Sequence, residues 1–148
     1  MENPEKILVY TDGGALNNPG PAAAAFILKK VEGSQEIPWK EYSEFLGKAT
    51  NNEAEFWAVI LALKKLKHLL GKKRIKRVPV EFFSDSQLLI NQLNHRFKIE
   101  APKIQKLFLQ VWNILVDYDK VKFSYIPREK NKAADQLVQQ ALKQKISQ

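Results

Sequence analysis

The chain has 148 residues, of which 45% are hydrophobic, and its 24 lysine and arginine residues outweigh 16 aspartate and glutamate residues to give a formal charge of +8. Such a basic surface favours a polyanionic partner, although solubility alone would account for the same composition. The absence of cysteine excludes disulfides, thiol nucleophiles and thiolate metal sites from the possible functions.

Length and composition predict a single domain spanning residues 1–148. The apolar run near the N-terminus is too short for a signal peptide, and no run approaches the ~20 residues of a membrane helix. We therefore expect a soluble, cytoplasmic, monomeric protein that has no membrane partner.

Three strands joined by short turns are predicted in the first third of the chain. The consecutive apolar residues at 7–9 indicate that residues 6–12 form a central strand. A turn-rich loop at 13–21, a second strand at 22–30, a hairpin turn at 32–38 and a third strand at 39–48 follow. Short turns make neighbouring strands antiparallel, and the imperfect alternation of the third strand suits a sheet edge.

Helices separate the remaining strands. A long helix is predicted from residue 53 to about residue 70, where Gly71 would end it, and Pro102 suits the first turn of a later helix that reaches about residue 118. The other expected elements are a strand at 78–84, a helix at 86–94, a strand at 120–126, a loop at 127–131 and a closing helix at 132–146. Because the last two strands follow helices, they should lie parallel to the first. The expected fold is therefore α/β, with a mixed five-stranded sheet and helices on both faces.

Two aspartates stand where predicted parallel strands end. Asp12 closes the first strand, and Asp85 follows the run VEFFS of the fourth strand, immediately before a helix. Functional sites of open α/β sheets form outside the carboxyl ends of the strands, so these two carboxylates should meet there. Asp85 has an alternative role as the cap of the helix that follows it.

Helical geometry selects a third acid. Glu53 and Glu55 are two residues apart at the start of the long helix, so their side chains point to nearly opposite faces. Glu55 shares its stripe with small or apolar residues that suit packing against a sheet, namely Ala58, Val59, Ala62 and Leu66. Glu53 lies on a wetter face and is interpreted as a first-turn acid that favours the helix dipole. An unpaired carboxylate on a buried stripe is costly, so Glu55 should have a metal or a hydrogen-bond donor as its partner.

A fourth candidate is Asp135, in the first turn of the closing helix, for which Asn131 is a possible N-cap. Considered alone, Asp135 would be interpreted as another acid that favours the helix dipole. Several carboxylates at one point stay ionised only with cations among them, and oxygen ligands suit Mg²⁺ or Mn²⁺ rather than zinc. Two such ions about 4 Å apart can hold the attacking water and the leaving oxygen of a phosphoryl group. An acidic centre on a basic surface therefore indicates a nuclease.

Four stretches of the chain resemble ribonuclease H of type 1. They are TDGGALNNPGP at 11–21, TNNEAE at 50–55, SDSQLLINQL at 84–93 and NKAADQL at 131–137. The resemblance covers nearly the whole chain and implies the mixed sheet described above. It also implies Mg²⁺-dependent endonucleolytic cleavage of the RNA strand of RNA–DNA hybrids by a two-metal-ion mechanism, leaving 3′-hydroxyl and 5′-phosphate ends. It assigns the metal-binding and catalytic roles to Asp12, Glu55, Asp85 and Asp135.

The same resemblance implies contacts to the substrate. Asn18, Asn51 and Asn52 match positions that read the minor groove and the 2′-hydroxyls of the RNA strand. Amides suit this task because each can both donate to and accept from a hydroxyl. Their ordinary alternative roles are those of a turn residue for Asn18 and of helix-start residues for the other two.

Contacts to phosphate are implied less directly. Thr50 matches a position that holds a phosphate of the DNA strand, and its ordinary alternative role is that of a helix cap. Lys48 is a candidate to join it, and Asn91, on the helix after Asp85, is a weaker candidate for substrate binding.

The sequence departs from better-known members of the family in the loop before the last acid. Many members carry a histidine there, whereas this loop reads PREKN, and the two histidines, His68 and His95, lie elsewhere. Arg128 and Glu129 are the candidate substitutes. Arg128 could contact the scissile phosphate, but a solvated loop cation is an equally ordinary role for it.

A second departure is the missing basic protrusion that some members insert after the fourth strand's helix. A basic cluster elsewhere could replace it, formed by Lys64, Lys65, Lys67, Lys72, Lys73, Arg74, Lys76 and Arg77. We favour a solvated face for this cluster, because it lies toward the far end of the long helix from Glu55.

Three other functions compete with hydrolysis of RNA–DNA hybrids. Within nucleases, the alternative is a broader specificity that includes double-stranded RNA. A non-catalytic nucleic-acid-binding module is the alternative from another class, but clustered acids facing phosphates would only weaken its binding. A small-molecule phosphotransferase would need a glycine-rich phosphate loop that opens a helix, which Gly13 and Gly14 do not provide.

Overall fold

The computed structural model describes residues 3–146, which form a five-stranded sheet with the strand order β3-β2-β1-β4-β5. The strands are β1 (Lys6–Ala15), β2 (Gly20–Glu32), β3 (Gln35–Ala49), β4 (Val80–Ser84) and β5 (Val121–Tyr125). β1 pairs antiparallel with β2 and β2 with β3, whereas β4 lies parallel to both β1 and β5. The predicted mixed sheet is confirmed, with the first strand in its centre and the third at an edge.

The helices are α1 (Asn51–Ile75), α2 (Gln87–Leu93), α3 (Pro102–Leu115) and α4 (Lys132–Ile146), with a single 3₁₀ turn at Arg128–Lys130. The regular part of α1 ends at Gly71, whose φ of 82° lies outside the helical region, and a further turn follows it. Pro102 occupies the first turn of α3, as predicted.

The first strand is longer than predicted, because Gly13 and Gly14 lie within β1 and pair with Ala24 and Ala23 of β2. The prediction of a loop from residue 13 is therefore wrong. Gly13 serves close packing: a Cβ atom there would lie 2.3 Å from the carbonyl carbon of Ala54 in α1. A glycine whose sequence context is typical of a turn instead lets a helix cross directly over a strand.

The hairpin between β2 and β3 is also tighter than predicted. Only Gly33 and Ser34 form the turn, and both have positive φ angles, of 58° and 65°. Two-residue turns of this kind match the right-handed twist of the flanking strands, so pairing continues up to the turn. Pro38 therefore lies within β3, where an edge strand tolerates a residue that has no N–H group.

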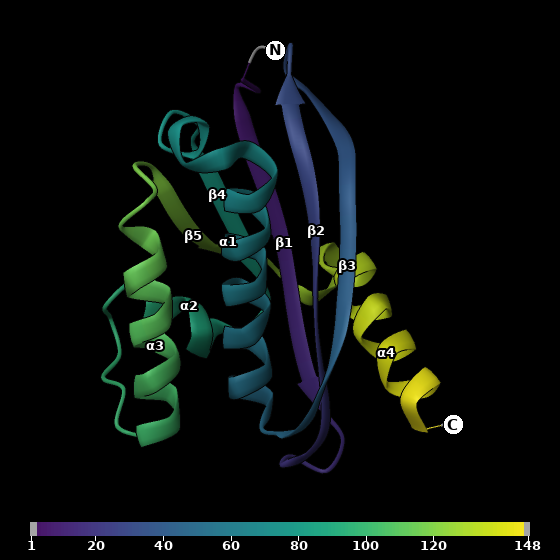
Figure 1. Cartoon of the computed structure of the whole chain (residues 1–148). Coiled ribbons are helices and arrows are strands. Elements are labelled where there is room, and N and C mark those ends of the chain that lie inside the picture. Colours follow the sequence, from purple (N-terminus) through teal and green to yellow (C-terminus); the bar gives the residue numbers. More distant parts are fainter. Residues whose placement is uncertain (1–2, 147–148) are drawn as a thin grey trace.

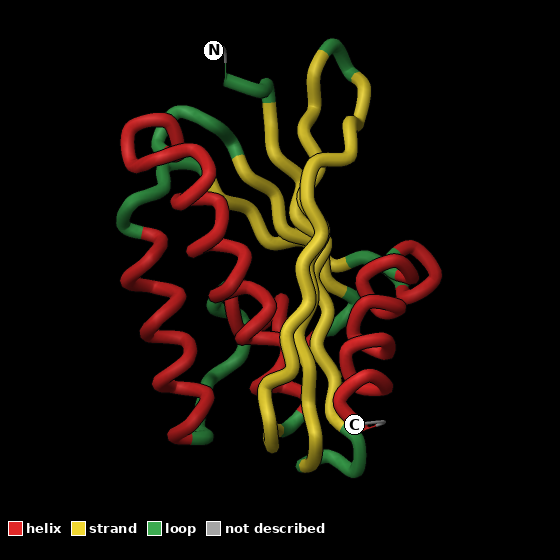
Figure 2. Tube along the Cα trace, turned by 45° about the vertical axis from the view of Figure 1, so that its right-hand side comes forward, coloured by secondary structure: helices red, strands yellow, loops and turns green. Residues whose placement is uncertain are grey.

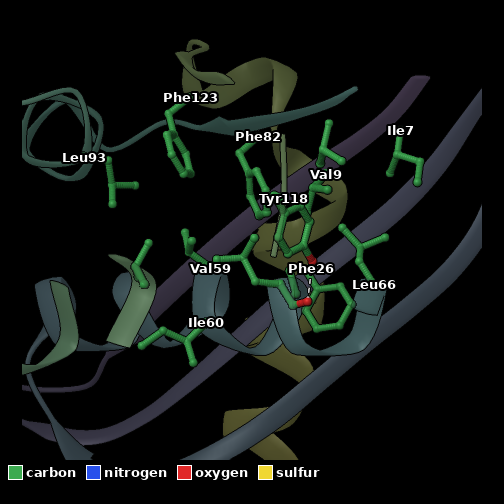
Figure 3. Packing of buried hydrophobic residues seen from close by; sticks show 14 of the residues in the cluster. Ile7, Val9, Phe26, Val59, Ile60, Leu66, Phe82, Leu93, Tyr118 and Phe123 are labelled. Carbon is green, nitrogen blue, oxygen red and sulfur yellow. Dashed lines mark hydrogen bonds between the residues drawn. The ribbon is translucent and has the colours of Figure 1, made fainter. Parts of the chain in front are cut away.

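Helices cover the two faces of the sheet unequally (Figure 1). α1, α2 and α3 lie on one side, and α4 lies alone on the other side, as the rotated view confirms (Figure 2). The main hydrophobic core lies under α1 and contains Phe26, Phe82 and Leu66, among other residues (Figure 3). In this core the Tyr118 hydroxyl donates a hydrogen bond to the Leu63 carbonyl oxygen of α1.

The α4 face is packed mainly by small side chains. Ala23 and Ala25 of β2 are fully buried against Val138 and Leu142 of α4. This close approach seats the middle of α4 on β2. Among the helices of residues 3–146, none is long and apolar enough to cross a membrane.

Candidate active site

The carboxyl ends of β1 and β4 bring two aspartates together. Asp12 lies on β1, and Asp85 comes directly after the last residue of β4, its parallel neighbour. The Thr11 hydroxyl donates to the Phe83 carbonyl oxygen at 3.2 Å and so ties the two strand ends to each other. The predicted meeting of these acids at one sheet edge therefore has a direct structural cause.

Glu55 joins them from the second turn of α1. One carboxylate oxygen from each of Asp12, Glu55 and Asp85 lies within 4.8 Å of the other two. The absence of a side chain at Gly13 permits this arrangement, because a Cβ atom there would also lie 2.5 Å from the Glu55 backbone nitrogen. The close crossing of α1 over β1 thus places Glu55 beside Asp12.

Glu53 has a different task at the start of the same helix. The Glu53 N–H donates to the Thr50 hydroxyl at 3.1 Å, and the Thr50 N–H donates to the Glu53 carboxylate at 2.9 Å. This reciprocal pair is a capping box, which satisfies two backbone donors that the helix leaves open. The face argument that separated Glu55 from Glu53 agrees with this geometry.

Asp85 is not the cap of α2. That role belongs to Ser86, whose hydroxyl accepts a hydrogen bond from the Leu89 N–H at 3.1 Å. A hydrogen bond from Ser86 also lowers the pKa of Glu55 against the opposing effect of burial. The side chain of Asp85 is therefore not needed to begin the helix.

Asp135, in the first turn of α4, lies in the wall of the same cleft, which has a volume of about 240 Å³. We call this cavity the acid cleft, since Asp12, Glu55, Asp85 and Asp135 all line it. Asp135 is outside the tight group of three, but its negative charge raises the pKa of Asp12 and of Asp85.

Asn131 connects the start of α4 to β1. Its side-chain nitrogen donates to the Thr11 carbonyl oxygen at 2.9 Å. Its side-chain oxygen is buried and has no hydrogen-bond partner among the described residues. A hydrogen bond from Asn131 also lowers the pKa of Asp85, against the larger effect of burial. The expected role of Asn131 as a side-chain N-cap is therefore wrong, because the side-chain oxygen that would cap the helix accepts no hydrogen bond from the described residues.

Burial and mutual repulsion strongly perturb the acids. Asp12 is only 8% exposed, and burial, followed by the charges of Asp85, Asp135 and Glu55, raises its pKa to about 8. Burial likewise raises the pKa of Glu55 to about 7, with Asp85 contributing in the same direction. Protein groups alone therefore do not keep all of these carboxylates ionised at neutral pH.

A hard divalent cation fits this donor set. The three converging side chains offer only carboxylate oxygen, which suits Mg²⁺ or Mn²⁺ and lacks the nitrogen and sulfur ligands typical of zinc sites. A cation placed among them would offset the repulsion that raises their pKa values.

The loop before α4 places Arg128 at the acid cleft. Its positive charge lowers the pKa of Glu55 and of Asp85. Glu129, the other candidate in this loop, is exposed and does not line the cleft. The two histidines lie elsewhere: His95 packs edge-on against Phe108, and His68 lines a groove between α1 and α3.

The predicted RNA-reading asparagines are held in place by hydrogen bonds beside the cleft. The Asn18 side-chain oxygen accepts from the Asn51 N–H at 2.8 Å, and the Asn51 side-chain oxygen accepts from the Ala15 N–H at 2.8 Å. The Asn52 amide nitrogen donates to the side-chain oxygen of Gln92 at 3.1 Å. Of the three asparagines, only Asn51 lines the acid cleft itself.

The other predicted contacts lie outside the acid cleft. Lys48 is exposed near the end of β3, and the Thr50 hydroxyl is engaged in the cap of α1. Asn91 lies within α2 and is half-buried. None of these three residues lines the described part of the cleft.

Sequence reasoning missed the groups that support the acids. Ser86 stands next to Asp85 and could have been found from that position alone. The sequence predicts a capping role for Asn131 and indicates no role for Gln92. The partner of Asn131 is 120 residues away in the sequence and that of Gln92 is 40 residues away, so local patterns carry no signal for them.

Comparison with known families gives a match over most of the chain. Residues 10–141 match the family model described as "Reverse transcriptase-like". A protein named "Ribonuclease H" from Prosthecochloris aestuarii is 30% identical over 94% of this chain and 97% of its own length. "Ribonuclease HI" of Halobacterium salinarum is 30% identical over 93% of this chain and 64% of its own length. A "bifunctional protein" of Mycobacterium tuberculosis is 27% identical, but this chain spans only 35% of its length.

Solved structures show the same relation. LC11-RNase H1, determined in complex with an RNA/DNA hybrid, superposes with a TM-score of 0.88 at 35% identity, covering 95% of this chain and 99% of that one. RNase H1 from the halophilic archaeon Halobacterium salinarum gives a TM-score of 0.82 at 31% identity, covering 94% of this chain and 98% of that one.

Proposed function

The chain belongs to the ribonuclease H family, and we propose that it is an endoribonuclease that hydrolyses the RNA strand of RNA–DNA hybrids. The observation that carries this proposal is the convergence of Asp12, Glu55 and Asp85, whose carboxylate oxygens can lie within 4.8 Å of one another. The similarity to LC11-RNase H1, which was solved with an RNA/DNA hybrid, supports the choice of substrate. We propose that residues 1–148 act as one catalytic domain and as a monomer, since every acid of the cleft comes from the same chain.

The four acids of the cleft would hold divalent cations, with Mg²⁺ as the proposed ion and Mn²⁺ as the alternative. The chemistry that two such cations supply is activation of a water and neutralisation of charge on the leaving oxygen, which gives 3′-hydroxyl and 5′-phosphate products. The protein's own contribution is to position the carboxylates. Ser86 lowers the pKa of Glu55, and Asn131 lowers that of Asp85, so both favour the ionised form of a cleft acid.

We propose that Arg128 contacts the phosphate at the scissile position. It lines the acid cleft, and a guanidinium group can bind phosphate oxygens with two parallel hydrogen bonds. This residue would supply positive charge from the loop in which many family members carry a histidine.

Substrate recognition is proposed to involve both strands of the hybrid. Asn18, Asn51 and Asn52 would contact the RNA strand, since their amides are already ordered beside the cleft. Thr50 and Lys48 would contact a phosphate of the DNA strand, and Asn91 would lie at the margin of this surface.

Asp85→Asn tests the proposed function. The asparagine keeps the shape of the side chain, and Ser86 continues to cap α2, so the fold should persist. We expect Mg²⁺-dependent hybrid cleavage to fall by about 10³-fold or more, because several kcal/mol of transition-state stabilisation depend on the site. Asp119→Asn, at an exposed acid outside the cleft, is the matched control and should cleave normally.

Two results would contradict the proposal. Cleavage by Asp85→Asn at the wild-type rate would show that the Asp85 carboxylate is not required for catalysis. Binding of hybrid by the wild-type protein with no turnover in either Mg²⁺ or Mn²⁺ would instead indicate a binding module. The same assay with RNA duplex and DNA duplex shows whether double-stranded RNA is also a substrate.

A further inference from the structure

The three asparagines beside the acid cleft are not held in the same way. Backbone N–H groups engage the side-chain oxygens of Asn18 and Asn51, at 2.8 Å in each case. These bonds orient both amides so that the nitrogen is the end that remains for a ligand. Both residues are exposed, which makes that end accessible.

Asn52 is held with the opposite polarity. Its side-chain nitrogen donates to Gln92 at 3.1 Å, so its carbonyl oxygen is the end that remains. An amide without a partner can present either end by rotating about its terminal bond. In the structure the hydrogen bond to Gln92 engages the nitrogen of Asn52 and leaves its oxygen for a ligand.

Gln92 is well placed to fix the Asn52 side chain. It is 7% exposed, although glutamine is usually found on the surface, and it lies on α2 between the buried residues Ile90 and Leu93. A buried amide that faces a second amide on a neighbouring helix is best satisfied by a hydrogen bond to it. Its contact with Asn52 joins α2 to the first turn of α1.

This difference in polarity matches the chemistry of ribose. A 2′-hydroxyl can both donate and accept a hydrogen bond, whereas deoxyribose has no hydroxyl at this position and can do neither. Donors alone would recognise the hydroxyl oxygen, but only an acceptor recognises its hydrogen. Asn52 provides that acceptor beside two residues that provide donors.

We propose that Gln92 is a positioning residue, which orients the Asn52 amide so that its oxygen accepts a hydrogen bond from a ribose 2′-hydroxyl of the bound strand. This inference rests on the proposed function, since it assumes that Asn52 faces the RNA strand. It adds a residue that touches no substrate and that nonetheless determines how the RNA strand is distinguished from DNA.

The experiment measures binding, so that it does not depend on turnover. RNA–DNA hybrids carry a single 2′-fluoro substitution at each RNA position in turn, and dissociation constants are measured in EDTA. Fluorine keeps a weak acceptor but removes the hydrogen that an Asn52 oxygen would bind. We expect wild-type protein to lose about tenfold in affinity at one position, the value of one hydrogen bond.

Gln92→Met removes the acceptor that holds Asn52 and keeps the length of the side chain. We expect this variant to bind the unmodified hybrid about tenfold more weakly and to lose the penalty at the sensitive position. Asn94→Leu is the matched control, because it also removes an amide hydrogen bond near the end of α2, from Asn94 to the Phe123 carbonyl oxygen at 3.0 Å. A general loosening of α2 would alter the fluorine profile of both variants, whereas loss of positioning alters only that of Gln92→Met.

Three outcomes would overturn the inference: a wild-type profile without any sensitive position, a Gln92→Met profile that equals the wild-type profile, and an Asn94→Leu profile that changes in the same way as that of Gln92→Met. Failure of the proposed function is a separate result, namely hybrid that is bound but not cut in Mg²⁺. Thermal unfolding of each variant verifies that the binding data come from folded protein.

Discussion

Replacing Asp12 with asparagine removes the most strongly perturbed carboxyl group of the acid cleft. Burial and three neighbouring acids raise the pKa of Asp12 from its ordinary value of 3.8 to about 8. Below pH 3.8 the group is protonated in both the folded and the unfolded chain and has no effect on stability. Between pH 3.8 and 8 the unfolded chain releases a proton that the folded chain retains, so the stability of metal-free wild-type protein falls as the pH rises.

The magnitude follows from the difference between the two pKa values. One pKa unit corresponds to about 1.4 kcal/mol, so the penalty reaches a ceiling of about 4 kcal/mol at pH 7 and about 6 kcal/mol above pH 8. Asparagine cannot ionise and avoids this penalty, but it has hydrogen-bonding needs of its own. We therefore expect Asp12→Asn to be more stable than wild type by about 2–4 kcal/mol at pH 7 in EDTA.

Urea unfolding at pH 5, 6, 7 and 8 in EDTA measures the effect. The difference between the two proteins should grow by up to about 1.4 kcal/mol per pH unit. Asp119→Asn, at an exposed acid, should show no such growth. Saturating Mg²⁺ should reduce the difference, because a cation at 100 times its dissociation constant stabilises the wild-type protein by about 2.7 kcal/mol. A variant that is no more stable than wild type at pH 8, or a difference that does not change with pH, would refute the reasoning.

Three further predictions concern packing, hydrogen bonding and charge. Gly13→Ala forces a methyl group to within 2.3 Å of the Ala54 carbonyl carbon, so we expect loss of hybrid cleavage and of about 3 kcal/mol in urea unfolding. Gly14→Ala, whose nearest contact would be 3.6 Å, is the control, and equal effects of the two changes would contradict the packing argument. Tyr118→Phe removes a buried donor to the Leu63 carbonyl and should lower the free energy of unfolding in urea by about 1–2 kcal/mol. An unchanged free energy of unfolding would show that this hydrogen bond does not stabilise the fold. Hybrid affinity should fall by about 10²-fold or more between 50 and 200 mM salt in a titration, and a flat response would exclude a footprint based on phosphate contacts.

The order and type of the elements could be predicted from sequence because apolar periodicity reports which residues are buried. Strand ends were less predictable, as Gly13 illustrates. Its sequence context is typical of a turn, but its role is set by α1, which crosses it from 41 residues further along the chain at Ala54. Only the folded structure reveals this requirement.

The acids could be proposed from sequence for a similar reason. Asp12 and Asp85 follow apolar runs that end abruptly, and helical spacing separates Glu55 from the capping residue Glu53. For Asp135 the local pattern favoured an ordinary helix-dipole role, and only the docking of α4 on the sheet places it in the cleft. The supporting amide of Gln92 depends wholly on tertiary contacts, so no local pattern could have indicated it.

The acid cleft can be completed only late in the synthesis of the chain. Its acids come from β1, α1, the β4–α2 junction and α4, and Asp135 is the last of them to be translated. A nascent chain whose α4 is still inside the ribosomal tunnel has no fourth acid and no Asn131 to bridge to β1. On the proposed function, cleavage therefore begins only after the closing helix has packed against the alanines of β2.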